Sequence, residues 1–557
     1  MGEERRTSPG AGQVLRGTEA LTAMPDPSVP KSDLIVAQSE IFSAPIPGVY
    51  RDPVTWAIVL AVFGSYAALS LFRLLQLNPT SWDLGIYTEY VKQYAHLKAP
   101  VVDIRAAGFN LLGDHFQPIV ALLAPIFRVF PSAATLLIAQ ALLAALSVFP
   151  VSQLAREKLG VGPGRAIALA YGFCWGLQQM VEFDFHEIAF AVPLLAFSLS
   201  ALVRGHLKAA TWWALPLVFV KEDQGFTVAA IGLYLIIAGL RASGPAPATS
   251  GPQERGSTGG VPANQDPDGL RRMRAGLLLL IWGFGWSFLA IGVIIPHVNP
   301  AHQYGYWSDG GVLAPGGHLS ALGLVEQFLH AWPDKLQTIV LLLLPTAFIA
   351  LRSPLALIAV PSLLLRFLST NSSFWGTFWH YNATIMPIVF IAAIDALVRI
   401  RAAMDSDDPG GFASWASGRR GPWCAILAGA RHYGVAMMLA IAVPLAFYFP
   451  LSNLWNAQTY RISPHVAAAE AAMAKVPDGA TVQTTLDLLA PLAARTDTFW
   501  IGNSGNPRTQ YLVFDGRDSD YSPAVTNVPA FIAQLYPHHV YTQIFSSGDV
   551  YVFRLTS

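Results

Sequence analysis

Charged side chains are scarce in this sequence. Asp, Glu, Lys and Arg make up only 13% of the 557 residues, whereas hydrophobic residues make up 53%. So little charge cannot solvate the surface of a water-soluble fold of this length. The formal net charge is zero, which excludes a protein that binds nucleic acid through an excess of Lys and Arg. We therefore expect a lipid bilayer to be the solvent of most of the chain.

Cysteine is scarce too. Cys174 and Cys424 both fall in or beside apolar segments, so a disulfide framework and a cysteine-based metal site are excluded. Residues 1–51 lack the short apolar core that follows the basic start of a cleavable signal peptide. They are rich in Pro, Gly, Ser and charge, a composition typical of disorder, and we expect a disordered cytoplasmic tail.

Long apolar segments dominate the rest of the chain. Most contain about 17 to 25 residues, enough to cross a hydrocarbon core of about 30 Å as helices. The sequence therefore predicts a polytopic α-helical membrane protein with about 11 transmembrane helices in a domain spanning residues 52–453. The expected helices are 53–77, 132–154, 164–181, 188–204, 209–220, 225–241, 274–296, 335–352, 354–370, 382–401 and 432–452.

Lys and Arg are distributed unevenly between the alternate loops that these spans define. One set of loops carries 16 of them and the other set carries 7 before the C-terminal segment. Because short loops rich in positive charge stay cytoplasmic, we expect a multi-pass protein of the cell (plasma) membrane with its N-terminus inside. Two of the cytoplasmic loops, 242–270 and 402–430, have the Gly-, Pro-, Ala- and Ser-rich composition of flexible linkers.

The C-terminal segment, residues 454–557, has a different pattern. A helical stretch precedes the strand-like "TVQTT", the helix-like "LDLLAPLAA" and the strand-like "TFWIG" and "QYLVF", and a hairpin-like pair, "YTQIF" and "VYVFRL", ends the chain. About 100 residues are enough to form a domain of their own. We predict a soluble α/β domain on the extracytoplasmic side.

Asp83 begins the first outer segment, "SWDLGIYTEYVKQYAHL". Leu84, Tyr87, Val91 and Tyr94 recur at helical spacing, which predicts an amphipathic helix lying at the membrane surface. The simplest role for the Asp83 carboxylate, which lies where membrane and water meet, is to cap this helix and offset its dipole. That role is compatible with a functional one.

Further polar clusters interrupt the apolar sequence at predicted outer helix ends. Ionisable groups cost about 2.5 to 3.5 kcal/mol each at the bilayer centre, so at membrane depth they are usually paired or line a wet cavity. A solvated turn or an internal ion pair explains each cluster as well as a substrate site does. The candidate substrate-binding residues are Tyr87, Asp114, His115, Asp184, His186, Glu187, Lys221, Glu222, Asp223, Arg366, His380 and Tyr381. Their spacing matches no established metal-ligand motif, so a divalent metal stays open.

Several of these motifs resemble known proteins. A first span followed by an outer acidic helix and a surface-helix segment (residues 118–131) is similar to the polytopic C-type (GT-C) glycosyltransferases. More closely, "WDLGIYTEY", "GDHFQPIVALLAPIF", "FDFHEIAFAVPLLAF", "KEDQG" and "VQTTLDLLAPLAAR" resemble an uncharacterised bacterial membrane-protein family, domain of unknown function 2079. The resemblance covers about residues 55 to 515 and implies a GT-C-like fold.

The C-type resemblance also implies a chemistry. In such enzymes a polyprenyl-phosphate sugar donor is held among the spans, an acidic residue of the first outer loop is the base, and a basic residue steadies the leaving phosphate. Transferred to this sequence, Asp83 is the catalytic candidate, and Lys221, His380 and Arg366 are candidate phosphate partners. The paired acidic motif is missing, because the next acidic residue is Glu89, which puts metal dependence in doubt.

Three functions therefore stay open. The first is transfer of a sugar from a polyprenyl-phosphate donor to an envelope acceptor on the outer face of the membrane. The second is a transporter or flippase for a lipid-linked or polar solute, and the third is a non-catalytic envelope scaffold. Membrane lipid is an expected partner, whereas oligomeric state, donor sugar and acceptor are left open.

Overall fold

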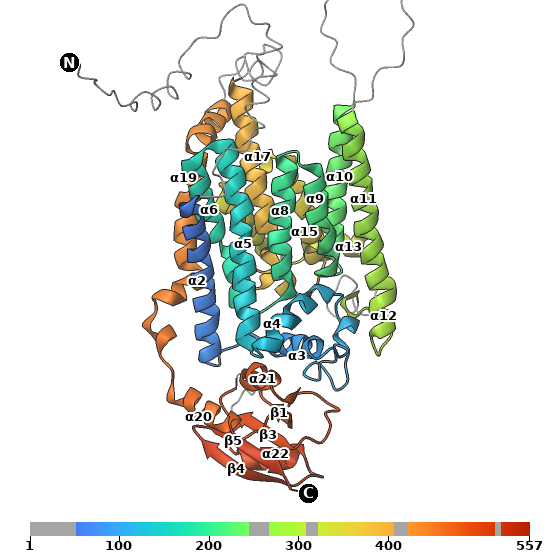
Figure 1. The fold of residues 1–557 in the computed structure, drawn as a ribbon, viewed down its shortest axis with the longest axis vertical. Helices are drawn as coiled ribbons and strands as arrows, with labels where there is room; N and C mark the ends of the chain where they lie inside the picture. Colours follow the sequence, from blue (N-terminus) through green and yellow to red (C-terminus); the bar gives the residue numbers. More distant parts are fainter. Residues whose placement is uncertain (1–51, 244–266, 308–320, 406–421, 519–524, 557) are drawn as a thin grey trace, which may run out of the picture. The chain divides into compact units, whose positions relative to one another are not determined.

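The structure is a computed structural model that describes residues 52–243, 267–307, 321–405, 422–518 and 525–556 (Figure 1). Residues 53–557 belong to one compact unit. The predicted N-terminal tail lies outside the described residues, as do the central parts of both predicted cytoplasmic loops. The ends of those loops are helical, because α11 begins at Pro267, α17 ends at Asp405 and α19 begins at Pro422.

Among the residues that the structure describes, five helices are long and apolar enough to cross a membrane, and a bent pair, Ser372–Asn382 with Ile385–Met404, would make a sixth. The predicted number of about 11 spans is therefore not confirmed, although every predicted segment contains helix. The long helices are α2 (Pro53–Leu75), α5 (Ala133–Leu159), α10 (Gln224–Ala242), α11 (Pro267–Leu289), α17 (Ile385–Asp405) and α19 (Pro422–Tyr448).

The remaining predicted spans are broken into shorter pieces. Pro216 is the second residue of one short 3₁₀ turn and Pro354 is the first residue of another, because proline lacks the N–H that would continue an α-helix. Ala347 and Phe348 have left-handed backbone conformations that end the segment after α14. The short helices are α4 (Ala124–Val129), α6 (Val161–Gly172), α7 (Trp175–Glu182), α8 (Ala191–Val203), α9 (Leu207–Ala214), α12 (Ile295–Val298), α13 (Ala321–Leu329), α14 (Trp332–Leu343), α15 (Val360–Phe367) and α16 (Ser372–Trp375).

Helices α10 and α11 pack unusually closely along their length (Figure 1). A Cβ atom on Gly232 would lie 2.5 Å from the carbonyl oxygen of Gly276, and one on Gly225 would lie 2.4 Å from that of Gly283. Glycine at these positions lets the two backbones touch, as small residues do between membrane helices. The hairpin that they form contributes one wall of the polar cavity described below.

The C-terminal segment forms a five-stranded sheet with the strand order β2-β1-β3-β5-β4. Strands β1–β3 are parallel, whereas β5 runs antiparallel to β3 and β4. The predicted strand and helix segments are all present, and an additional helix, α22, precedes the final hairpin. The elements are α20 (Pro464–Met473), β1 (Thr481–Thr484), α21 (Leu486–Ala493), β2 (Asp497–Trp500), β3 (Tyr511–Asp515), α22 (Val528–Leu535), β4 (Tyr541–Ser547) and β5 (Val550–Leu555).

The first outer helix, α3 (Asp83–Ala95), is more enclosed than the sequence suggests. Residues 84–92 are all buried, because α21 covers the side of α3 that was expected to face water. A Cβ atom on Gly85 would lie 2.9 Å from the Cβ atom of Leu489, and Lys92 Nζ donates a 2.6 Å hydrogen bond to the carbonyl oxygen of Thr496. The expected helix is therefore present, but protein covers the side that amphipathicity would leave to water.

Candidate functional site

Four turns bring polar side chains together beside the start of α3. They are the residues just before and within α3, the turn after α7 (residues 182–187), the turn between α9 and α10 (residues 221–223) and the turn before α17 (residues 380–382). A fifth segment, residues 299–307, follows α12 and closes one side. Connections between helices thus supply most of the polar groups of the site.

Asp184 fixes the shape of the turn after α7. Its backbone is left-handed, with φ +68°, a conformation that Asp adopts more readily than most residues. Its Oδ2 atom accepts a 2.7 Å hydrogen bond from the backbone N–H of Thr80, and Gln140 bonds to the backbone on either side of Phe185. Asp184 therefore holds the turn in place and directs the next residues inward.

Glu187 is the centre of a buried polar network. It is fully buried, and its Oε1 atom lies 3.1 Å from Lys221 Nζ. The Tyr87 hydroxyl and the ring of His186 both contact Oε2. Burial alone would raise the pKa of Glu187, but the neighbouring charges of His186 and Lys221 hold that pKa well below its ordinary value. Glu187 is therefore an anion that positions Lys221.

Asp83 lies half-buried beside this network. Its Oδ2 atom accepts a 2.8 Å hydrogen bond from the Ser81 hydroxyl, and the residue that flanks the helix start is Trp82, whose side chain caps nothing. Burial raises the pKa of Asp83, opposed by the nearby positive charges of His186 and Lys221. The carboxyl is thus a stronger proton acceptor than an ordinary aspartate, and its surroundings differ from those of a capping residue.

A second buried carboxylate, Glu222, organises the other side of the site. His115 Nδ1 lies 2.7 Å from Oε1 of Glu222, the Tyr304 hydroxyl donates to the same oxygen at 2.8 Å, and the backbone N–H of Phe116 donates to Oε2 at 3.0 Å. Burial and Lys221 would each lower the pKa of His115, yet the contact with Glu222 leaves that pKa raised. Glu222 therefore favours the protonated form of His115, and the two side chains form an internal contact.

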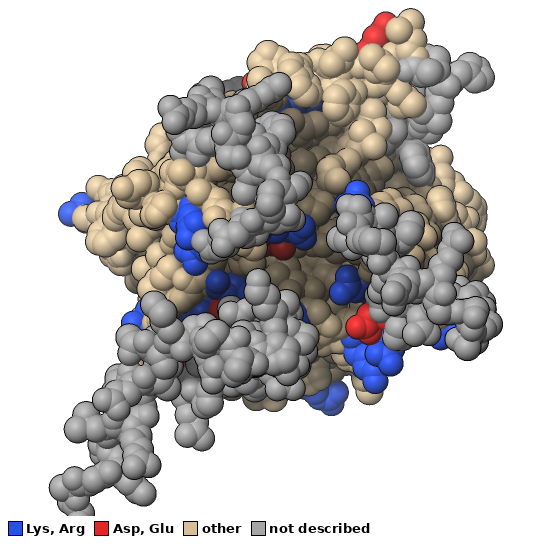
Figure 2. Space-filling model, turned by 90° about the horizontal axis from the view of Figure 1, so that it is seen from above, with Lys and Arg blue, Asp and Glu red and all other residues tan. Residues whose placement is uncertain are grey.

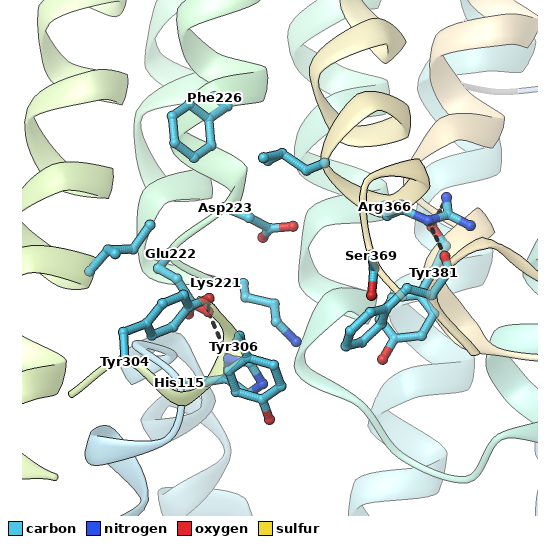
Figure 3. A pocket seen from close by; sticks show the side chains of 13 residues that line it. His115, Lys221, Glu222, Asp223, Phe226, Tyr304, Tyr306, Arg366, Ser369 and Tyr381 are labelled. Carbon is cyan, nitrogen blue, oxygen red and sulfur yellow. Dashed lines mark hydrogen bonds and ion pairs between the residues drawn. The ribbon is translucent and has the colours of Figure 1, made fainter. Parts of the chain in front are cut away.

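A cavity of about 120 Å³ opens between these groups (Figure 3). Its polar lining includes Lys221 and Asp223, and the ring of Tyr381 lies across the cavity from Glu222. The ring of Tyr306 stacks on His115 with the centroids 4.3 Å apart. The other wall is apolar and consists of Phe226, Ile291 and Leu365. The cavity therefore combines a charged wall with an apolar wall.

Arg366 closes one end of this cavity. It is buried, and its guanidinium donates to the carbonyl oxygens of Phe374 (2.6 Å) and Tyr381 (3.1 Å) and to the Asn382 side chain (2.8 Å). In the part of the chain that the structure describes, no carboxylate forms an ion pair with Arg366. Three of its five N–H groups are thus used, and its positive charge has no acidic neighbour in direct contact.

The candidate residues divide into three groups. Six line the cavity, namely His115, Lys221, Glu222, Asp223, Arg366 and Tyr381. Tyr87, His186, Glu187 and His380 form the adjoining network, in which the rings of His186 and His380 stack with centroids 3.5 Å apart. Asp184 and Asp114 lie elsewhere, because Asp184 anchors its own turn and Asp114 pairs with Arg105 at 3.6 Å.

Sequence reasoning missed the aromatic segment after α12. Tyr304 and Tyr306 line the cavity, but they come from an irregular segment whose position no periodicity reveals. The only signal was the density of aromatic residues in "HQYGYW". Among the residues that the structure describes, no group of three or more His, Cys, Asp or Glu side chains is arranged to hold a metal ion.

The chain matches a sequence family and, separately, several solved structures. The family described as predicted membrane protein (DUF2079) matches residues 73–522, which confirms the resemblance expected from the sequence. No curated protein matches the chain.

Solved structures to which the chain is similar include ArnT from Cupriavidus metallidurans bound to undecaprenyl phosphate, with 13% identity, a TM-score of 0.48 and coverage of 89% of this chain and 97% of that one. The same protein in its apo state has a TM-score of 0.45. The oligosaccharyltransferase of Archaeoglobus fulgidus has 13% identity, a TM-score of 0.35 and coverage of 90% of this chain and 74% of that one.

Proposed function

We propose that this multi-pass membrane protein, which belongs to the DUF2079 family of predicted membrane proteins, is a glycosyltransferase that moves a sugar from a polyprenyl-phosphate donor to an envelope acceptor. The observation that carries the proposal is the position of Asp83. It is a half-buried carboxyl whose pKa is raised by burial and opposed by the charges of His186 and Lys221. Asp83 does not itself line the cavity, but Lys221, which acts on its charge, does.

The two walls of the cavity match the two ends of such a donor. A polyprenyl-phosphate sugar is an amphiphile, so its phosphate needs hydrogen-bond donors and its lipid needs apolar contacts. Lys221 and Arg366 supply positive charge, and the hydroxyls of Tyr306 and Tyr381 form no hydrogen bond with any residue that the structure describes. Phe226, Ile291 and Leu365 supply the apolar wall. This division favours a lipid-linked substrate over a fully water-soluble one.

The chemistry assigns Asp83 to the acceptor. Transfer to a hydroxyl forms a new glycosidic bond while the acceptor loses a proton, and a carboxylate within reach removes that proton in the transition state. The bond between the sugar and the phosphate breaks, and the phosphate leaves with an added negative charge. Lys221 and Arg366 stabilise that charge, because fixed cations in a water-poor site act strongly on developing charge.

Asp83→Asn tests the assignment. The amide keeps the size of the side chain and can still accept a hydrogen bond from Ser81, so we expect a folded protein with an unchanged melting temperature. Transfer of radiolabelled sugar from a polyprenyl-phosphate donor should fall by about 100-fold or more, the usual contribution of a general base. Asp334→Asn, at an exposed carboxylate in the first turn of α14, is the matched control and should retain transfer.

The outcome separates the proposed functions. Normal transfer by Asp83→Asn would remove the assigned base. Flux of a lipid-linked solute across proteoliposomes without any new glycosidic bond would instead identify a transporter or flippase. A protein that binds no donor at all would leave the scaffold as the remaining function.

A further inference from the structure

A second and larger cavity lies where α8 ends and α11 begins. Its volume is about 1360 Å³, and its walls come from the turn between α8 and α9 and from parts of α9, α10, α11 and α17. It shares no lining residue with the cavity beside Asp83. Figure 2, which looks onto this end of the bundle, shows Lys and Arg side chains around a recess. The transferase proposal gives this cavity no role.

The charged wall of this cavity is strongly basic. Two acidic side chains line it, and each is already paired, because Asp268 lies 3.3 Å from Arg271 and Asp395 lies 2.7 Å from Arg399. Lys208, Arg272 and Arg274 also line the cavity, and none of them pairs with an acidic residue in the described part of the chain. Around this hollow, three positive charges therefore have no carboxylate partner among the described residues.

The other wall of the cavity is apolar and faces outward. Trp212 and Leu278 line it and are 71% and 50% exposed, and Leu215 and Leu235 extend it between α9 and α10. Tryptophan with one face toward lipid is typical of the interface between a membrane and water. A soluble anion would use only the basic wall, whereas a lipid with an anionic headgroup would use both walls.

Lys and Arg side chains without a carboxylate partner among the described residues are concentrated at this cavity, in contrast to other basic residues at the same end of the bundle. Elsewhere on the basic loops, Arg204 pairs with Glu157 at 2.6 Å and Arg156 lies 3.5 Å from the Thr55 hydroxyl. The general excess of Lys and Arg in cytoplasmic loops explains why this end is basic. It does not explain why Lys208, Arg272 and Arg274 line one hollow with an apolar wall.

We infer that this cavity binds the phosphate headgroup of an anionic membrane lipid. Arg272, Arg274 and Lys208 contact the phosphate, and the acyl chains lie along Trp212 and Leu278. Clusters of Lys and Arg at the cytoplasmic ends of membrane helices attract anionic lipids in this way. The bound lipid would join α9 to the α10–α11 hairpin, and this inference is independent of the transferase proposal.

The test measures lipid binding by the full chain. The purified, delipidated protein is titrated in detergent with phosphatidylglycerol, with phosphatidylcholine of the same acyl chains and with a polyprenyl phosphate, and the bound lipid is counted by native mass spectrometry. We expect phosphatidylglycerol to bind at least tenfold more tightly than phosphatidylcholine. Arg272→Gln with Arg274→Gln should weaken phosphatidylglycerol binding by roughly 30-fold, and Lys at both positions should restore most of it.

The control removes the same amount of charge outside the cavity. Lys158→Gln with Arg241→Gln should leave phosphatidylglycerol binding unchanged, since neither residue lines the cavity. Equal loss in both double variants, or equal binding of phosphatidylcholine, would overturn the inference. Tighter binding of polyprenyl phosphate through the same two arginines would support a lipid-phosphate site and identify the polyprenyl lipid as its occupant.

Discussion

The buried pair of Lys221 and Glu187 allows a structural role to be separated from a role in substrate binding. Lys221→Met keeps the length of the side chain but removes the charge that lies 3.1 Å from Glu187 Oε1. Removing one partner of a buried ion pair costs about 3–5 kcal/mol. Because Tyr87 and His186 still contact Glu187, we expect a loss near 3 kcal/mol in the free energy of unfolding.

A double variant should restore the free energy of unfolding that Lys221→Met loses. Glu187→Gln with Lys221→Met leaves no uncompensated charge, so most of the stability should return, measured as the free energy of unfolding in mixed detergent and denaturant. Sugar transfer should stay low in both variants if Lys221 stabilises the leaving phosphate. Arg204→Met, which breaks the more exposed pair with Glu157, is the control and should cost no more than about 1 kcal/mol without loss of transfer.

One outcome would refute a role for Lys221 in phosphate binding. If the double variant is as stable as the natural protein and transfers sugar at the natural rate, Lys221 serves only to neutralise Glu187. The phosphate would then have to be held by other groups, and Arg366 would be the remaining cation of the cavity wall. A stable single variant would instead show that Glu187 is protonated, contrary to the lowered pKa assigned to it.

Three further predictions concern pH, the C-terminal sheet and helix packing. Because burial raises the pKa of Asp83 and the base must be ionised, kcat/KM for transfer should fall with decreasing pH through a midpoint above the ordinary aspartate value of about 3.9, and a midpoint at or below that value would contradict this assignment. Lys92→Met removes the cation beside buried Glu89, whose pKa is raised to about 8, and also the hydrogen bond from Lys92 to the carbonyl oxygen of Thr496, between α21 and β2. Hydrogen exchange in α21 and β2 should therefore accelerate, and unchanged protection would show that Lys92 does not hold these elements against α3. Gly232→Leu should prevent α10 and α11 from packing and lower the melting temperature sharply, whereas Gly285→Leu, with no atom within 4 Å of its Cβ position, should not.

The sequence predicted the membrane class and the C-terminal sheet well, because both depend on local patterns. Apolar length marks a membrane helix, and a short continuous apolar run marks a buried strand such as Tyr511–Asp515. The number of spans was less predictable. Left-handed residues such as Ala347 and Phe348 divide apolar segments into pieces that hydropathy alone reads as continuous, and the enclosure of α3 depends on its distant contact with Leu489.

The candidate site was predictable only where charge interrupts apolar sequence. Lys221 and Glu222 stand between two apolar segments with almost no loop, so their burial follows from the shortness of the connection. Tyr304 and Tyr306 were not predictable, because an irregular segment brings them to the cavity from far along the chain. Asp184 was predicted as a substrate-binding residue for the same reason, but its carboxylate holds its own turn and does not line the cavity.

The balance of charge in the site explains why Asp83 is the carboxylate to which catalysis is assigned. Glu187 is neutralised by Lys221 and Glu222 by His115, and the pKa values of both glutamates are lowered, so neither accepts a proton readily. Asp83 and Asp223 are different, because burial raises the pKa of each. Asp223 lines the cavity together with Arg366 and Lys221, where a lipid phosphate would lie and where a second anion repels it. Asp83 does not line that cavity, so under the proposed function a phosphate bound there would repel its charge less than it would repel that of Asp223.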